Sequence, residues 1–123
     1  MILVDTSIWI DHLRQGDERL VELLNRGQVL SHPHVIGELA LGSLQNRHAV
    51  LEALQSLPQA TIATHAEVLS SIDTLALFGL GIGYTDAHLL AAVRLTPGSR
   101  LWTRDKHLLA ASIRLAIDYP SAH

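Results

Sequence analysis

The chain has 123 residues, of which 48% are hydrophobic and 17% charged, so it is long enough for one domain with a buried core and too apolar to be disordered. The absence of cysteine excludes disulfides and thiolate metal sites, and a formal net charge of -3 excludes a global basic field for nucleic acid. Without internal repeats or an apolar run of membrane-spanning length, we expect a single domain over residues 1–123, soluble, cytoplasmic and away from membranes.

Short apolar runs that favour strands alternate with segments of helical periodicity along the chain. In chain order, we predict a strand at 2–4, helices at 8–13 and after Asp17, a strand at 28–31, helices at 34–44 and 47–57, a strand at 60–64, helices at 66–78 and 85–95, a strand at 101–103, a helix at 106–112 and an edge strand at 115–119. Thr6 and Ser7 are predicted to cap the first helix. This alternation is typical of a mostly parallel sheet covered on both faces, in which ligands bind beyond the carboxyl ends of the strands.

Four acidic residues fall where such a ligand would bind. Asp5 ends the first predicted strand, Asp105 follows the fourth, and Asp86 opens the helix after a glycine-rich break. Glu38 lies on an apolar helix without Lys or Arg within one turn, so burying it would be costly unless it is paired or coordinates a cation. In the alternative interpretation, the three aspartates are helix-terminal acids and the glutamate lies on a solvated face.

Carboxylates gathered at one sheet edge would repel one another and raise one another's pKa values. A hard divalent cation such as Mg²⁺ or Mn²⁺ removes that conflict, because it prefers carboxylate and water oxygens as ligands. A metal held in this way can activate a water molecule and stabilise charge on a phosphodiester. If the four acids meet in space, they therefore predict a metal-dependent hydrolase.

Four short motifs are spread over the chain: VDTS at 4–7, GEL at 37–39, YTDAHLLAA at 84–92 and LWTRDK at 101–106. In this order they resemble the PIN domain family, and the whole chain, its length included, resembles the VapC-type toxins of type II toxin–antitoxin pairs. The resemblance implies a three-layer α/β/α sandwich around a mostly parallel sheet of about five strands. It also implies an endoribonuclease that depends on Mg²⁺ or Mn²⁺.

The resemblance assigns the acids to a catalytic, metal-binding quartet: Asp5, Glu38, Asp86 and Asp105. Thr103 matches a hydroxyl position that supports such a site, and Thr6 or Ser7 would do the same from the first loop. Family members are dimers that a cognate antitoxin binds and inhibits. We therefore expect a homodimer, an antitoxin partner and an RNA substrate.

Three basic residues are predicted to contact RNA. Arg104 and Lys106 flank Asp105, and Arg14 follows the helix that starts beside Asp5. Arginine suits this role because its guanidinium can form two hydrogen bonds with one phosphate. The alternative is that these residues are solvated surface charges.

Three other interpretations remain open. The histidines at 32, 34, 88 and 107 would suit zinc, but no HExxH motif is present, and packing or surface roles are the expectation. A phosphatase of the haloacid dehalogenase type would also place a nucleophilic Asp after the first strand, but it needs a second Asp where Ser7 stands. A non-enzymatic α/β module that binds a partner would explain the high apolar content and use the acids only as caps.

Overall fold

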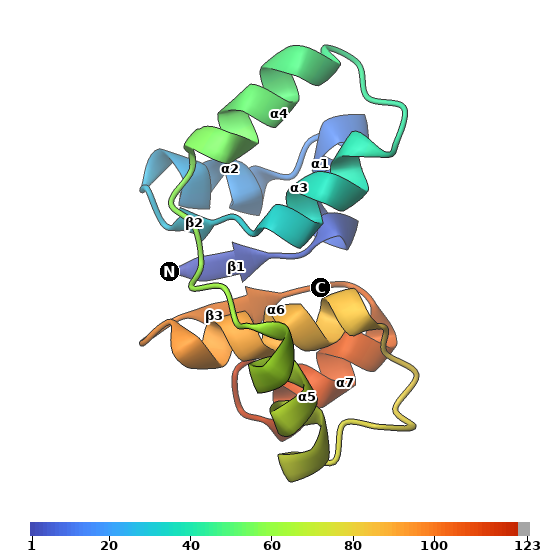
Figure 1. The fold of residues 1–123 in the computed structure, drawn as a ribbon. Coiled ribbons are helices and arrows are strands. Elements are labelled where there is room, and N and C mark those ends of the chain that lie inside the picture. The colour runs from blue at the N-terminus through green and yellow to red at the C-terminus, as the bar shows by residue number, and fades with distance from the viewer. Residues whose placement is uncertain (121–123) are drawn as a thin grey trace.

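The structure is a computed structural model that describes residues 1–120, in which short parallel strands alternate with helices (Figure 1). In chain order the elements are β1 (Ile2–Val4), α1 (Thr6–Gln15), α2 (Glu18–Asn25), β2 (Val29–Leu30), α3 (Pro33–Ala40), α4 (Arg47–Ser56), α5 (His65–Thr74), α6 (Tyr84–Leu95), β3 (Arg100–Trp102) and α7 (Lys106–Arg114). Within the described part of the chain, no helix has the length and apolar character needed to cross a membrane.

The central strand of the sheet is β1, because the strand order is β2-β1-β3 and both pairings are parallel. Ile2 pairs with Val29 on one side and with Arg100 on the other. All of β1 is buried, as expected for the inner strand of a covered parallel sheet. The ladder continues past β1, since the Asp5 amide donates to the Trp102 carbonyl at 3.0 Å. Asp5 is thus fixed beside the carboxyl end of β3.

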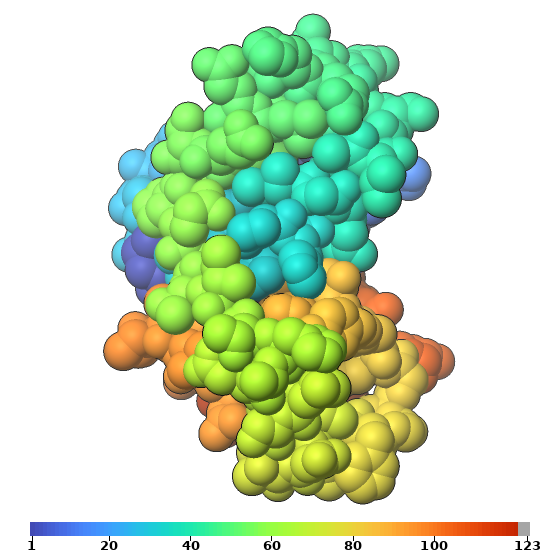
Figure 2. All heavy atoms as spheres, in the orientation of Figure 1, coloured from blue at the N-terminus to red at the C-terminus, as the bar shows by residue number. Residues whose placement is uncertain are grey.

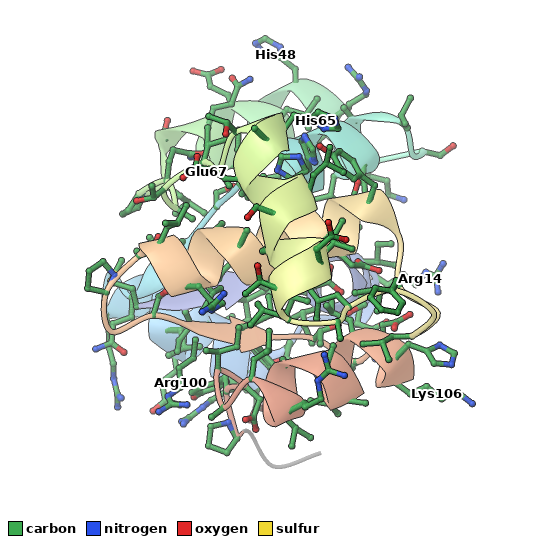
Figure 3. The ribbon with its side chains drawn as sticks, turned by 60° about the horizontal axis from the view of Figure 1, so that its bottom comes forward. Arg14, His48, His65, Glu67, Arg100 and Lys106 are labelled. Carbon is green, nitrogen blue, oxygen red and sulfur yellow. The ribbon has the colours of Figure 1, made fainter. Side chains whose placement is uncertain are left out.

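Helices cover both faces of this sheet, which confirms the predicted α/β/α sandwich. Helices α1 to α4 gather around β2 and α5 to α7 around β3 (Figure 1), and α5 with the segment after it forms the lower end of the molecule (Figure 2). Seen with that end turned forward, α6 and α7 lie on opposite faces of β3 (Figure 3). Buried side chains such as Leu3, Ile8, Leu89, Leu101 and Trp102 join the sheet to α1 and α6 in one core.

The sheet of the described residues has three strands, so the prediction of about five is wrong. Residues 60–64 do not form the predicted strand. The nearest pairing is a single bridge between Ser31 and Gln59, just before this segment. The chain then turns away from β2, because the amide of Thr61 donates to the hydroxyl of Thr96 at 3.0 Å. A two-residue β2 offers too short a template to hold this segment in the sheet.

The strand predicted at 115–119 is also wrong, because only a single bridge joins Leu101 to Asp118. The guanidinium of Arg100 donates to the carbonyls of Ala116 and Asp118, at 3.2 and 3.3 Å. Ala116 has a φ of 59°, which strand backbone does not adopt. The segment therefore crosses the edge of β3 without forming a ladder.

The helices lie where the sequence predicted them, with shifted ends. The cap of α1 is Asp5, so the caps predicted at Thr6 and Ser7 are wrong; these two residues form the first turn of the helix instead. The Asp5 carboxylate takes the capping role because it accepts from the Ser7 amide, at 3.4 Å. Asp17 caps α2 as predicted and accepts from the Leu20 amide at 3.0 Å.

Candidate functional site

Asp5 is the most strongly held of the predicted site residues. It is buried, with 6% exposure, and its Oδ2 accepts hydrogen bonds from the Ser7 hydroxyl at 2.8 Å and the Thr103 hydroxyl at 2.7 Å. Within residues 1–120, no hydrogen bond reaches its Oδ1. One carboxylate oxygen is therefore fixed by the protein, and the other is left to accept from, or coordinate, a further group.

Thr103 links Asp5 to Asp105. The buried Thr103 hydroxyl, which donates to Asp5, accepts from the Asp105 amide at 3.0 Å. Asp105 in turn caps α7, where its Oδ1 accepts from the Leu108 amide at 2.9 Å. The supporting role predicted for Thr103 thus has a geometric basis, because one hydroxyl orders two of the four acids.

Glu38 differs from its prediction in burial. Its side chain is exposed, because Val35 and Leu39 form the buried face of α3 and Glu38 does not lie on that face. The carboxylate of Glu38 therefore bears no burial cost, contrary to the prediction from its apolar helix. The structure gives it a polar partner instead: the Thr6 hydroxyl donates to Glu38 Oε1 at 2.7 Å, across 32 residues of sequence. The start of α1 thus directs Glu38 toward the end of β1.

Asp86 is half-buried in the first turn of α6, where its Oδ2 accepts from the Gly83 amide at 3.1 Å. Its pKa is raised above the usual range, chiefly because burial disfavours the charged carboxylate. The Gly83 hydrogen bond opposes this shift, and the negative charges of three further carboxylates add to it: Asp5, Asp105 and Glu38. The other three predicted acids therefore lie near enough to Asp86 to act on it electrostatically.

The capping interpretation holds for Asp5 and Asp105, which cap α1 and α7, and Asp86 closes the first turn of α6. Asp5, Asp105 and Glu38 also lie near enough to Asp86 to add to the rise in its pKa that burial causes. A metal site shared by the four acids stays a prediction. Among the described residues, no three His, Asp or Glu side chains form a preformed cage for a metal ion. Mg²⁺ does not require one, because it commonly keeps several waters and takes only one or two carboxylates directly. The chemistry of these donors fits such a hydrated cation.

The basic residues predicted to contact RNA do not all lie where expected. The guanidinium of Arg104 forms salt bridges with Asp11 at 2.7 Å and Asp17 at 2.6 Å, so the RNA contact predicted for it has no support. Arg14 and Lys106 are exposed and extend from the same side of the molecule (Figure 3). The two acids that hold Arg104 went unnoticed in the sequence, because nothing in their spacing connects them to residue 104.

A cavity of about 410 Å³ opens between α1 and the end of α3, beside the acidic cluster. Glu38 and Arg14 both line it, with apolar side chains such as Leu13 and Leu44. The sequence gives no signal for this cavity, because the cavity depends on how α1 packs against α3. The cavity therefore brings a guanidinium from α1 and a carboxylate from α3 into one lining, and Glu38 is the acid of the cluster that borders it.

The rings of His32, His34 and His88 form one packed cluster, which takes no part in the hydrogen bonds of the four carboxylates in the described chain. The rings of His34 and His88 lie 4.4 Å apart, and those of His32 and His34 5.2 Å apart. His32 is buried and has a pKa lowered to about 4, first by burial and then by repulsion from His34 and His88. The ring of His107 lies against the backbone of Gly81. These contacts are packing contacts, the role that was expected for His88.

The model of the PIN domain family matches residues 2–113. The chain belongs to the PIN domain family. Two relatives, each named Ribonuclease VapC32, come from Mycobacterium tuberculosis strains CDC 1551 / Oshkosh and ATCC 25618 / H37Rv. Each is 55% identical to this PIN domain over 111 residues, which cover 90% of both chains. The resemblance to VapC-type PIN domains is thereby confirmed, and the haloacid dehalogenase interpretation is excluded.

Proposed function

We propose that this PIN domain is the toxin of a type II toxin–antitoxin pair, an endoribonuclease that hydrolyses RNA phosphodiester bonds with Mg²⁺ or Mn²⁺. The observation that carries the proposal is the convergence of carboxylates from four separate segments of the chain, where Asp5, Asp105 and Glu38 add to the rise in the pKa of Asp86 that burial causes. The names of the VapC32 relatives support RNA as the substrate. The family match over residues 2–113 supports treating residues 1–123 as one functional domain.

The proposed metal ligands and catalytic residues are the four acids of the cluster: Asp5, Glu38, Asp86 and Asp105. When bound, the cation supplies a water of lowered pKa and stabilises the charge that develops on the phosphoryl oxygens. Ser7 and Thr103 immobilise one oxygen of Asp5 and leave the other for a ligand, while Thr6 directs Glu38 inward. Hydrogen bonds of this kind fix the orientation of metal-binding carboxylates.

Arg14 and Lys106 are the proposed RNA contacts. They extend from the same side of the molecule, and Arg14 lines the cavity that also contains Glu38 (Figure 3). Because the chain carries a formal net charge of -3, RNA needs local cations of this kind to approach an acidic cluster.

We also propose a homodimer and an inhibitory antitoxin, both acting in the cytoplasm where RNA is made. Support comes from apolar side chains that the folded chain leaves exposed: Ile62, Leu69 and Phe78 are 55%, 48% and 66% exposed. They lie on or next to α5 and the segment after it, which form the lower end of the molecule (Figure 2). A patch of this kind is typical of a surface that another chain covers.

The rival candidate is a non-enzymatic module that binds a partner and uses its acids as helix caps. The capping bonds of Asp5 and Asp105 favour it. It does not explain why Thr6 orients an exposed Glu38 or why two hydroxyls converge on one oxygen of Asp5. A ligand bound by the carboxylates would account for both arrangements.

The deciding experiment is a cleavage assay with protein freed of any co-purifying partner. We expect structured RNA to be cut internally in Mg²⁺ or Mn²⁺, and cutting to stop in EDTA and resume when the metal is restored. Metal-independent cutting would point to a contaminating nuclease. If metal-loaded, folded protein cuts no RNA from a total cellular RNA preparation, the partner-binding module is the better interpretation.

A further inference from the structure

The side chain of Arg104 lies in a corner between α1, the start of α2 and β3. The proposed reaction does not explain its contacts there. Its guanidinium lies between Asp11 of α1 and Asp17, the cap of α2, at 2.7 and 2.6 Å. It also lies over the ring of Trp102, with 5.8 Å between the guanidinium carbon and the ring centroid. The side chain is only 37% exposed, and that of Asp17 only 16%. This is a partly desolvated, two-armed ion pair rather than a loose surface charge.

The backbone of the same residue reaches the acidic cluster. The Arg104 amide donates to the Ser7 hydroxyl at 3.1 Å, and that hydroxyl donates to Asp5 Oδ2 at 2.8 Å. Arg104 lies between Thr103 and Asp105 in the chain. The Thr103 hydroxyl donates to Asp5 and accepts from the Asp105 amide, so it joins both neighbours of Arg104 to the acidic cluster. Whatever fixes Arg104 therefore fixes the loop that carries Thr103 and Asp105.

The two ion pairs anchor this loop at one point. Burial alone would raise the pKa of Asp17, but hydrogen bonds from Arg104 and from the Leu20 amide outweigh that effect and hold the pKa below its usual range. Asp17 is thus charged and paired at neutral pH. The guanidinium has both of its terminal nitrogens engaged, which leaves it poorly suited to bind a phosphate as well.

We infer that Arg104 is a positioning residue, a clamp that ties the loop between β3 and α7 to the corner between α1 and α2 and so holds Thr103 and Asp105 in the geometry that metal binding and RNA cleavage require. This inference rests on the proposed nuclease function and replaces the RNA contact predicted from the sequence. The clamp depends on the fork shape of the guanidinium, because a lysine ammonium cannot reach both carboxylates in the same way.

The test compares Arg104→Lys and Arg104→Gln with Arg26→Lys and Arg26→Gln. Arg26 forms an exposed ion pair with Glu22 on α2 and serves as the matched control. We expect both Arg104 variants to lose roughly 10- to 100-fold in kcat or in affinity for Mn²⁺, as supporting residues of metal sites do. The KM for RNA should stay within about twofold of the wild type, and the Arg26 variants should behave as the wild type, as surface ion pairs contribute little.

Two readouts separate positioning from simple electrostatics. Arg104→Gln leaves Asp11 and Asp17 without a counter-charge, which by Coulomb attraction would favour a cation. A smaller Mn²⁺-induced rise in melting temperature in this variant can therefore come only from lost geometry. Asp11→Asn combined with Arg104→Gln should cost no more than Arg104→Gln alone, because both substitutions break the same clamp.

The RNA-contact alternative predicts a different result. Arg104→Lys would keep most of the activity, while Arg104→Gln would raise KM and lower the slope of log affinity against log salt by about 1, measured in EDTA. That outcome overturns the clamp, as does wild-type behaviour of both variants. If the wild type itself cuts no RNA, the nuclease proposal fails separately. The clamp is then judged by amide hydrogen exchange at Thr103 and Asp105, which must accelerate in folded Arg104→Lys for it to stand.

Discussion

The hydroxyl of Thr103 donates to the carboxylate of Asp5 at 2.7 Å, joining residues 98 positions apart in the sequence. The same oxygen accepts from the Asp105 amide, so a single side chain bridges the ends of two parallel strands. The candidate site is therefore built on the sheet itself, and its geometry depends on the register of β1 against β3.

Replacing this hydroxyl tests that dependence. In Thr103→Val the Asp5 carboxylate loses its closest donor, and we expect the affinity for Mn²⁺ to fall roughly 10- to 100-fold. Thr103→Ser keeps the donor and should retain most of the wild-type value. Isothermal titration with Mn²⁺ measures both, and equal affinities of the Val and Ser variants would show that the hydroxyl is not what orients Asp5.

Asp5 itself should be indispensable. We expect Asp5→Asn to abolish metal-dependent cleavage and to keep the fold, since asparagine is also a good helix cap. The matched control is Asp73→Asn, which removes an exposed carboxylate from α5 and should cut RNA at the wild-type rate. Cleavage and far-ultraviolet circular dichroism are measured on the same preparations. Wild-type cleavage by Asp5→Asn would rule out the assigned site.

A divalent cation should stabilise the folded protein. Burial raises the pKa of Asp86, and repulsion from Asp5, Asp105 and Glu38 adds to that rise, so a bound cation relieves a cost that the folded chain carries without it. At a concentration about 100 times its dissociation constant, the cation adds about 2.7 kcal/mol of stability. We expect a melting temperature higher by several degrees in Mn²⁺ than in EDTA, and a smaller difference for Glu38→Gln. An unchanged melting temperature in millimolar Mn²⁺ would count against the metal site.

Acid should destabilise the fold through His32. Its folded pKa is about 4, below the ordinary histidine value of 6.5, first because it is buried and then because of His34 and His88. Between these two pH values the unfolded chain binds the proton and the folded chain does not, so stability is fully present above pH 6.5 and falls as the pH decreases toward 4. The whole effect amounts to about 3 kcal/mol.

Urea unfolding at a series of pH values measures this loss. The His32 ring accepts from the His34 amide and so caps α3, a role that asparagine can also fill. His32→Asn should therefore lose most of the decline between pH 6.5 and 4. In contrast, His48→Asn, which changes a ring that is 97% exposed, should keep it. An equal decline in wild type and His32→Asn would assign the acid sensitivity to other groups.

The exposed apolar side chains should drive self-association. Leu69 and Phe78 leave 48% and 66% of their surface in contact with water in the single chain. We expect wild-type protein to scatter light as a dimer at micromolar concentration, and Leu69→Ser with Phe78→Ser to shift the population toward monomers. A wild type that stays monomeric at high concentration would contradict the proposed homodimer.

The sequence predicted the sandwich, because its strands and helices follow local patterns, and the resemblance to PIN domains singled out the four acids as one site. β1 is a short apolar run, and Asp5, Asp86 and Asp105 lie at helix starts where capping chemistry is readable. Where strands end in a parallel sheet, helix starts follow, so acids at these positions gather at one edge.

Tertiary contacts account for what the sequence did not predict. Residues 60–64 have strand-like composition, but the Thr61 amide donates to the hydroxyl of Thr96, the residue that caps the end of α6. Arg104 reads as a basic residue beside an acid, and only the fold brings Asp11 and Asp17 within reach of it. Glu38 lies on the exposed side of an apolar helix. The composition of that helix does not reveal which of its faces is buried.

The place of β1 in the sheet has a consequence for biosynthesis. The central strand β1 precedes β3, Thr103 and Asp105 in the chain. A nascent polypeptide on the ribosome therefore carries Asp5, Glu38 and Asp86 before β3, Thr103 and Asp105 have been made. Truncated products that end before residue 100 would lack β3, Thr103 and Asp105. Without the Thr103 hydroxyl that holds Asp5, we expect such products to have no nuclease activity.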